Sequence, residues 1–106
     1  MANIYLNAKK DLTTSTVTTL YSVPSNSRAI VKSLLVSEDT NTATTITVDL
    51  FDADPSTGNK FNLFKTQAVA GNETLQLLTE PLIMLENEVI QVTAADAILY
   101  MWWHPY

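Results

Sequence analysis

The sequence is a succession of short runs rich in threonine, valine, isoleucine and leucine, separated by residues that favour turns. Runs of this length and spacing are typical of strands in an all-β sandwich or barrel. The connections between them are too short for the crossovers that parallel strands need. We therefore predict an all-β chain of about eight strands, folded as two antiparallel sheets in a β-sandwich of jelly-roll or immunoglobulin-like order. The predicted strands are residues 4–8, 16–23, 28–37, 44–52, 60–69, 73–79, 88–93 and 97–103.

The run from residue 44 to residue 52 shows strand alternation most clearly. Successive side chains of a strand point to opposite faces, so every second residue shares a face. The apolar set is Ile46, Val48 and Leu50, and the polar set is Thr45, Thr47 and Asp49. Branching at Cβ restricts χ1 in a helix and suits a pleated sheet. We expect the apolar face of this strand to pack in a core.

Turn residues fall between the predicted strands. Pro24 ends the second run, and residues 54–59 form a polar loop in which Pro55 fixes φ and Gly58 is free to take a positive φ. Residues 70–72 and 95–96 are predicted to close hairpins. The stretch 80–85 is left open as a short strand or an extended crossover, because its proline argues against a central strand.

The composition indicates one globular domain covering residues 1–106. Hydrophobic residues make up 46% of the chain and charged residues only 16%. A free-standing enzyme usually carries more charge on its surface, since about a quarter of the residues in an average protein are charged. Low charge combined with many threonines indicates that another chain covers part of the surface.

The net charge of −5 argues against nucleic-acid binding, which needs clustered lysine and arginine to displace counterions from phosphates. The six basic residues are scattered: Lys9, Lys10, Arg28, Lys32, Lys60 and Lys65. There is no cysteine, so disulfides and thiolate metal sites are excluded. The start of the chain lacks the features of a signal peptide, and no segment has the roughly 20 apolar residues of a membrane span. We expect assembly in a cytoplasm and no membrane partner.

Three groups of polar residues are candidate sites. Asp49, Asp52 and Asp54 resemble a calcium loop, but the pattern counted from Asp52 lacks the glycine and glutamate that such a loop requires. A non-standard calcium site stays open against a solvated loop. His104 has neither a cysteine partner nor further zinc ligands, so we interpret it as a polar tail residue.

The third group, Glu80, Glu86 and Glu88, flanks a turn without a supporting catalytic motif. A charged loop is the simpler interpretation of these three residues. We predict no enzymatic activity, no catalytic residues, no metal and no cofactor.

The C-terminal segment carries apolar side chains on both faces of its predicted strand. Tyr100 and Trp102 point one way, while Met101 and Trp103 point the other. Both faces need cover, because a large exposed apolar patch is unusual on a monomer. The second face is covered by another subunit or by a loop of the same domain. A third alternative is that the tryptophans stack on sugar rings.

The order of strand edges and turns resembles a family of small β-sandwich structural proteins of tailed bacteriophages, common among marine and cyanobacterial phages. The resemblance rests on residues 20–24 and 28–36, followed by a threonine-rich strand, residues 70–75 and residues 85–94. It covers residues 13–94 and includes no catalytic signature. It implies a multicopy virion component without a cofactor. The aromatic end of this chain departs from the family, whose members finish in a more polar strand.

The resemblance leads us to expect a capsid decoration or cement protein on the outside of the virion shell, assembled in the host cytoplasm. Its partners would be the major capsid protein, further copies of itself as a trimer or other homo-oligomer, or both. Residues 1–11 and the tail 102–106 are candidate intersubunit arms. The candidate interface residues are Ile4, Tyr5, Tyr100, Trp102, Trp103 and Tyr106. The alternatives are a tail or fibre subunit, and a carbohydrate-binding module that contacts host glycans through Trp102, Trp103 and Tyr106.

Overall fold

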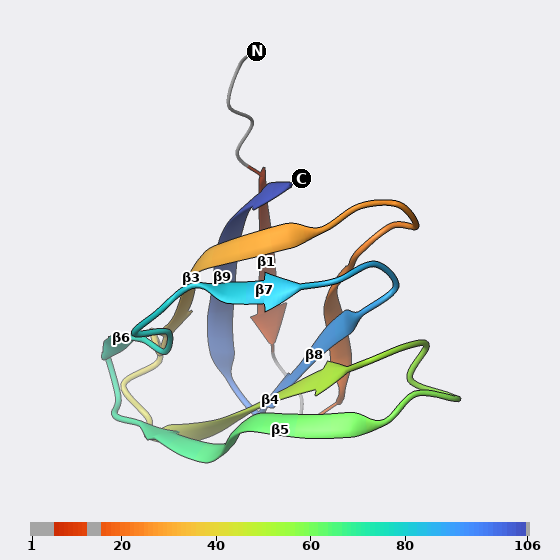
Figure 1. Cartoon of the computed structure of the whole chain (residues 1–106). Coiled ribbons are helices and arrows are strands. Elements are labelled where there is room, and N and C mark those ends of the chain that lie inside the picture. The colour runs from red at the N-terminus through yellow and green to blue at the C-terminus, as the bar shows by residue number, and fades with distance from the viewer. Residues whose placement is uncertain (1–5, 13–15, 106) are drawn as a thin grey trace.

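A computed structural model of the chain describes residues 6–12 and 16–105 and contains nine strands (Figure 1). Neither range contains a helix, and so neither holds one long and apolar enough to cross a membrane. The strands are β1 (Leu6–Leu12), β2 (Thr18–Ser22), β3 (Ala29–Ser37), β4 (Thr44–Phe51), β5 (Lys60–Val69), β6 (Thr74–Gln76), β7 (Leu82–Met84), β8 (Val89–Ala94) and β9 (Ala97–Pro105).

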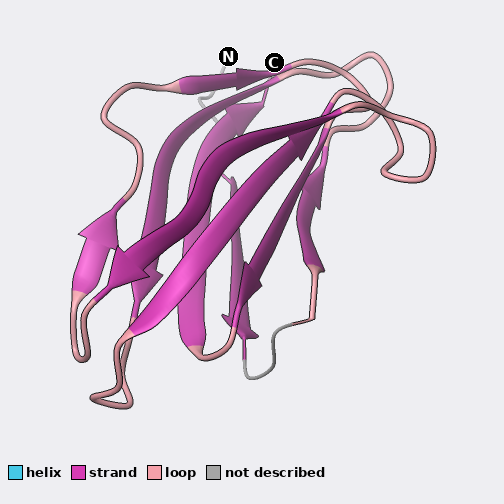
Figure 2. Ribbon diagram, turned by 90° about the horizontal axis from the view of Figure 1, so that it is seen from below, coloured by secondary structure: helices cyan, strands magenta, loops and turns pink. Residues whose placement is uncertain are grey.

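The strands form two antiparallel sheets that pack face to face (Figure 2). In the first, called sheet A, β9 lies between β1 and β3, and the far edge of β3 pairs with both β6 and β7. In the second, called sheet B, the order is β2-β8-β4-β5. The prediction of an all-β chain with two antiparallel sheets is confirmed.

The strand order is that of a jelly roll. If β6 and β7 count as one interrupted strand, all consecutive strands belong to opposite sheets except β4 and β5. This is the double Greek key of jelly rolls. In an immunoglobulin-like sandwich the first two strands would share a sheet. The predicted hairpins at residues 70–72 and 95–96 are wrong, because β5 and β6, like β8 and β9, lie in different sheets.

The core fills the space between the sheets with the inward-facing residues of the central strands. Sheet A contributes Ala97, Leu99, Met101 and Trp103 of β9, together with Ala29, Val31, Leu34 and Val36 of β3. Sheet B contributes Ile46 and Val48 of β4, together with Ile90, Val92 and Ala94 of β8. Tyr21 packs its ring on Trp103, with ring centroids 4.1 Å apart. The alternation predicted for β4 is confirmed for Ile46 and Val48, which are fully buried, whereas Leu50 is half-buried and Asp49 of the polar set is also buried.

A bulge in β3 changes which residues of that strand face inward. The register with β9 shifts between Val31 and Ser33, so Val31 and Leu34 both reach the core although they are three positions apart. The side chain of Gln76 braces the bulge. Its Oε1 accepts a hydrogen bond from the amide of Leu34 at 2.9 Å, and its Nε2 donates to Ser33 Oγ at 2.7 Å.

Several predicted strands differ from the structure in their limits, including β2, which is shorter than the predicted 16–23, and β9, which extends past residue 103. β1 runs further than the predicted 4–8, as far as Leu12, and residues 4 and 5 lie outside the described part of the chain. β6 is shorter than the predicted 73–79. The ambiguous stretch 80–85 forms β7, a three-residue edge strand that begins directly after Pro81, which is where proline is tolerated in a sheet.

Asparagine, and not glycine, adopts most positive φ values in the turns. Asn26, Asn41, Asn72 and Asn87 have φ between 60° and 66°, whereas no described glycine has a positive φ. The expectation that Gly58 uses its freedom in this way is wrong. Gly71 is required by close approach instead, because a Cβ there would lie 2.6 Å from the carbonyl carbon of Asn41.

Truncation of a central core residue tests this packing. Leu34 is fully buried, so Leu34→Ala is expected to lower the free energy of unfolding by about 2–5 kcal/mol through lost burial and a residual cavity. Val17, which is 55% exposed, provides the control, and Val17→Ala should change stability by less than about 0.5 kcal/mol. Urea unfolding measures both values. Equal effects of the two substitutions would contradict the assignment of the core.

Candidate functional site

A row of polar side chains crosses the middle of the outer face of sheet B, and Phe51 and Val89 lie on the same face near its end. Thr19, Gln91, Asp49 and Asn62 form one row across β2, β8, β4 and β5. Gln91 Nε2 donates to Thr19 Oγ1 at 3.1 Å, and Asn62 Nδ2 donates to Asp49 Oδ1. These side chains pair with one another across the strands, as expected for a face that meets water.

The outer face of sheet A is largely apolar over its central strands, although the exposed Lys32 also lies on it, at the β3 bulge. We call the following set the apolar face: Ile30 and Leu35 of β3, Ile83 of β7, and Ile98, Tyr100 and Trp102 of β9. Five of them are half-buried by their neighbours, and Ile83 is 56% exposed. Contiguous apolar side chains on an outward face are typical of an interaction surface. The middle of the outer face is thus polar on sheet B and largely apolar on sheet A, while sheet B also carries Phe61, which is 53% exposed.

Strand β9 explains the two-faced apolar pattern of the C-terminal segment. Tyr100 and Trp102 lie on the apolar face, while Trp103 is 3% exposed and lies in the core against Tyr21. Its burial removes Trp103 from the candidate interface residues. The segment from residue 102 to residue 105 is also no projecting arm, because it pairs with both β1 and β3. Ile4, Tyr5 and Tyr106 lie outside the described residues.

This arrangement of the two tryptophans argues against the interpretation that they stack together on sugar rings. Adjacent residues of a strand point to opposite faces, so Trp102 and Trp103 cannot offer two rings to one sugar chain. A platform on this strand would have to combine Trp102 with Tyr100, two residues away on the same face.

An open groove of about 1010 Å³ adjoins the apolar face at one end of the sandwich. Ile30 and Ile83 belong to both, and Leu85, which is 49% exposed, extends the apolar wall. The remaining wall is polar and comes from the connections β2–β3 and β7–β8 and from the residue after β4. Its charged members are Arg28, Asp52, Glu86 and Glu88.

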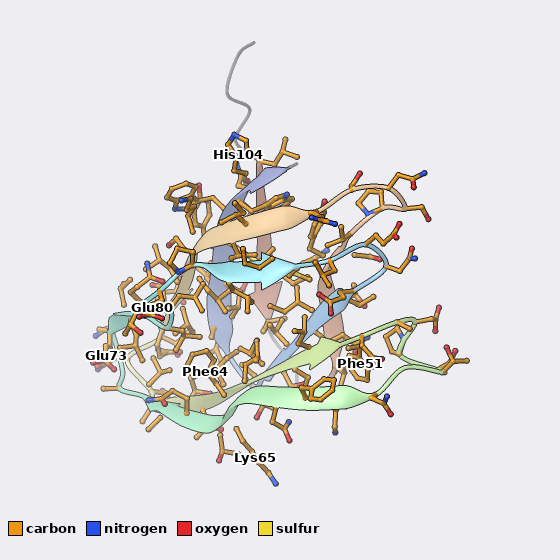
Figure 3. The ribbon with its side chains drawn as sticks, in the orientation of Figure 1. Phe51, Phe64, Lys65, Glu73, Glu80 and His104 are labelled. Carbon is orange, nitrogen blue, oxygen red and sulfur yellow. The ribbon has the colours of Figure 1, made fainter. Side chains whose placement is uncertain are left out.

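The carboxylates around this groove hold loops in place. Glu86 Oε2 accepts from the amide of Asn26 at 2.7 Å, which ties the β7–β8 connection to the β2–β3 connection. Glu88 Oε1 accepts from the amide of Leu85 at 2.6 Å. Glu80 lies apart in the β6–β7 connection (Figure 3). Glu80 therefore lies apart from the other two glutamates, and Glu86 and Glu88 each accept a hydrogen bond from a backbone amide of a loop.

The three aspartates considered as a calcium site are also divided. Asp49 bonds Asn62 on the outer face of sheet B, whereas Asp52 and Asp54 close the β4–β5 loop. The backbone amide and the side-chain amide of Asn59 hold the pKa of Asp52 below its usual value, and the hydroxyl and amide of Ser56 do the same for the pKa of Asp54. Within residues 6–12 and 16–105 no three acidic or histidine side chains gather as metal ligands would.

His104 belongs to β9 and is not a tail residue. It lies opposite Ile30 of β3 and is half-buried near the end of the strand (Figure 3). The interpretation of this histidine as a fraying polar end is therefore corrected.

Glu38 is a buried carboxylate that the sequence analysis did not identify as a candidate. It follows β3, is only 1% exposed and has no cation beside it in any described contact. Its carboxylate accepts hydrogen bonds from the amide of Thr40 at 2.6 Å, from the Thr40 hydroxyl at 2.8 and 2.9 Å, and from the amide of Thr42 at 3.2 Å. Burial raises the pKa of Glu38, but these hydrogen bonds together outweigh it and hold the pKa below the usual 4.5. The group organises the β3–β4 connection.

Comparison with known proteins finds no family model, no curated protein and no solved structure that matches this chain. The resemblance to phage structural proteins therefore stays a prediction.

The Glu38 site predicts a specific pH dependence. A carboxyl whose pKa is lowered by folding stabilises the protein above its unfolded pKa, and this stabilisation is lost as the pH falls through the folded pKa. Glu38→Gln should therefore be less stable than the parent at about pH 7, and the difference should shrink as the pH falls below 4.5 and through the lowered pKa of Glu38.

Urea unfolding across this pH range measures the difference. Asp39→Asn, a matched change at the exposed neighbouring residue, is the control and should leave stability unchanged. A stability gap between parent and Glu38→Gln that persists unchanged in acid would contradict the proposed role of this carboxylate.

Proposed function

We propose that this chain is a structural virion protein of a tailed phage, a capsid decoration or cement protein that acts by contact with other protein chains. The observation that carries the proposal is the contrast between the two outward faces. The polar side chains of sheet B bond one another, while sheet A directs six large apolar or aromatic side chains outward.

The physical argument is that apolar surface left in water is unfavourable by about 25 cal/mol per Å². A monomer would gain from covering the apolar face, and tyrosine and tryptophan are the residues that most often dominate interface energies. Strand order and burial both direct Tyr100 and Trp102 to this face. An adhesive protein needs such a surface and a rigid fold behind it.

Attachment to a shell adds a second factor. A standard interface buries about 800 Å² on each partner, and its strength depends on the anchors it contains. Many copies that bind a symmetric shell of major capsid protein reinforce one another, because each bound contact raises the effective concentration of the next. A modest contact per copy is therefore sufficient for a cement protein.

The jelly-roll fold is compatible with both a virion role and a sugar-binding role. The same architecture builds viral capsid domains and lectins, and function depends on the site and not on the fold. The position of Trp103 in the core weakens the carbohydrate alternative. A tail or fibre subunit would use the same apolar face and differs only in its place in the particle.

Mass spectrometry of purified virions of the encoding phage tests the proposal. We expect the chain in intact particles, at a copy number comparable to that of the major capsid protein or a simple fraction of it. A copy number fitting only the tail would favour the tail or fibre alternative. Absence from the particles would contradict the virion role altogether.

A glycan array with the purified chain tests the carbohydrate alternative separately. We expect no binding to any glycan. Binding that is lost in Trp102→Ala and kept in Lys65→Ala, a control on the opposite sheet, would replace the proposal with a sugar-binding function.

A further inference from the structure

We propose that Lys10 prevents the free edge of β1 from pairing with a strand of another molecule, so that contacts between chains are directed to other surfaces. The inference goes beyond the proposed function and does not rest on it, because it concerns the edge of sheet A alone. Its basis is the direction in which the Lys10 side chain leaves its strand.

The register of β1 places Lys10 on the side of sheet A that faces the core. Residues directly opposite each other on paired antiparallel strands direct their side chains to the same face. Lys10 is opposite Leu99 of β9, which is fully buried in the core. The other inward residues of β1 are Leu6, Ala8 and Leu12, and their partners on β9 are core residues too. Lys10 is therefore the charged member of an otherwise apolar set.

Lys10 is exposed although it points inward, because β1 is the outermost strand of sheet A. A lysine can lay its aliphatic chain along apolar surface and keep its ammonium group in water. Here the water lies beyond the edge of the sandwich, where β1 is next to β2, the edge strand of sheet B. A foreign strand paired with β1 would cover this margin, and burial of an unpaired ammonium group is strongly unfavourable.

The edge of β1 is regular enough to accept another strand. An unpaired edge offers its backbone N–H and C=O groups to other chains, and proteins block it with short strands, bulges, proline or inward-pointing charges. The seven residues of β1 pair with consecutive residues of β9, and no bulge interrupts them. The backbone of β1 therefore provides no obstacle of its own.

The other free edges have such obstacles in their backbone. The register of β2 with β8 shifts once, and the register of β5 with β4 shifts twice, with a positive φ at Thr66. β6 and β7 have three residues each, and Pro81 directly precedes β7. Among the edge strands within residues 6–12 and 16–105, β1 is the one that depends on a side chain for protection.

Pairing of two β1 strands shows why an inward lysine is effective. In a continuous antiparallel sheet, inward residues of one strand are opposite inward residues of the other. Lys10 would therefore be opposite either the second copy of itself, with two like charges together, or one of the apolar residues Leu6, Ala8 and Leu12. Asp11 cannot compensate this charge, because it is opposite Ile98 and points to the outer face.

This protection also restricts the intersubunit arm expected at residues 1–11. Within that range, residues 6–11 belong to β1, whose free edge is closed to a neighbouring sheet. Self-association of the chain, where it occurs, should therefore leave the β1 edge unpaired.

Lys10→Thr tests the inference, because threonine removes the charge and suits an edge strand. We expect this variant to self-associate at least about tenfold more strongly than the parent. Lys9→Thr makes the same change one residue away, on the outer face, and should associate within about twofold of the parent. Lys10→Arg keeps the charge and should also behave as the parent does.

Sedimentation velocity between about 1 and 200 µM measures the association of each chain. Hydrogen exchange then identifies the surface, because edge pairing of Lys10→Thr should protect the β1 amides that do not bond β9. The inference is overturned if Lys10→Thr associates no more than the parent, if Lys9→Thr associates equally, or if association leaves these amides unprotected. Concentration-dependent protection of the same amides in the parent would also overturn it, since the edge would then already be a contact.

Discussion

The fold depends on the pairing of β9 with strands on both of its sides. β1 and β3 bond its two edges over most of its length, so the last strand of the chain is central in sheet A. This position forces a strict division of its side chains. Leu99, Met101 and Trp103 enter the core, and the residues between them must face outward. A strand in that place is expected to be apolar inside and polar outside. Here the outer residues are Ile98, Tyr100 and Trp102, and our proposal of a protein partner rests on that departure.

The two sheets contribute differently to what the molecule can do. Sheet B satisfies its outer polar groups with one another, and its β4–β5 loop is closed by Asp52 and Asp54. In sheet A the jelly-roll order places β9 and β3 at the centre, and these two strands carry most of the outward apolar side chains.

Strand positions could be predicted from the sequence far better than their partners could. Alternation in β4 and β9 is a local property, and it correctly separated Ile46 from Thr47 and Trp102 from Trp103. The turns at residues 70–72 and 95–96 contain residues that are common in hairpins. Short turns of the same composition also connect strands of two different packed sheets, as they do here. The residues of a turn alone do not show which of these two connections it makes. The burial of Glu38 could not be predicted from the sequence for a related reason. Its partners Thr40 and Thr42 are near in sequence, yet the connection that buries it depends on contact with the β5–β6 connection through Glu73. The contrast between the two outer faces likewise needed the sheet order.

Acrylamide quenching of two single-tryptophan variants tests the central claim, that β9 directs one tryptophan into the core and the other to a protein contact. Trp102→Phe retains Trp103, and Trp103→Phe retains Trp102. We predict that Trp103 is protected from the quencher at every protein concentration, because it is buried within the monomer. Trp102 should be quenched in dilute protein and become protected as the concentration rises. If Trp103 is quenched in the folded monomer, or if Trp102 remains equally accessible at all concentrations, the account is contradicted.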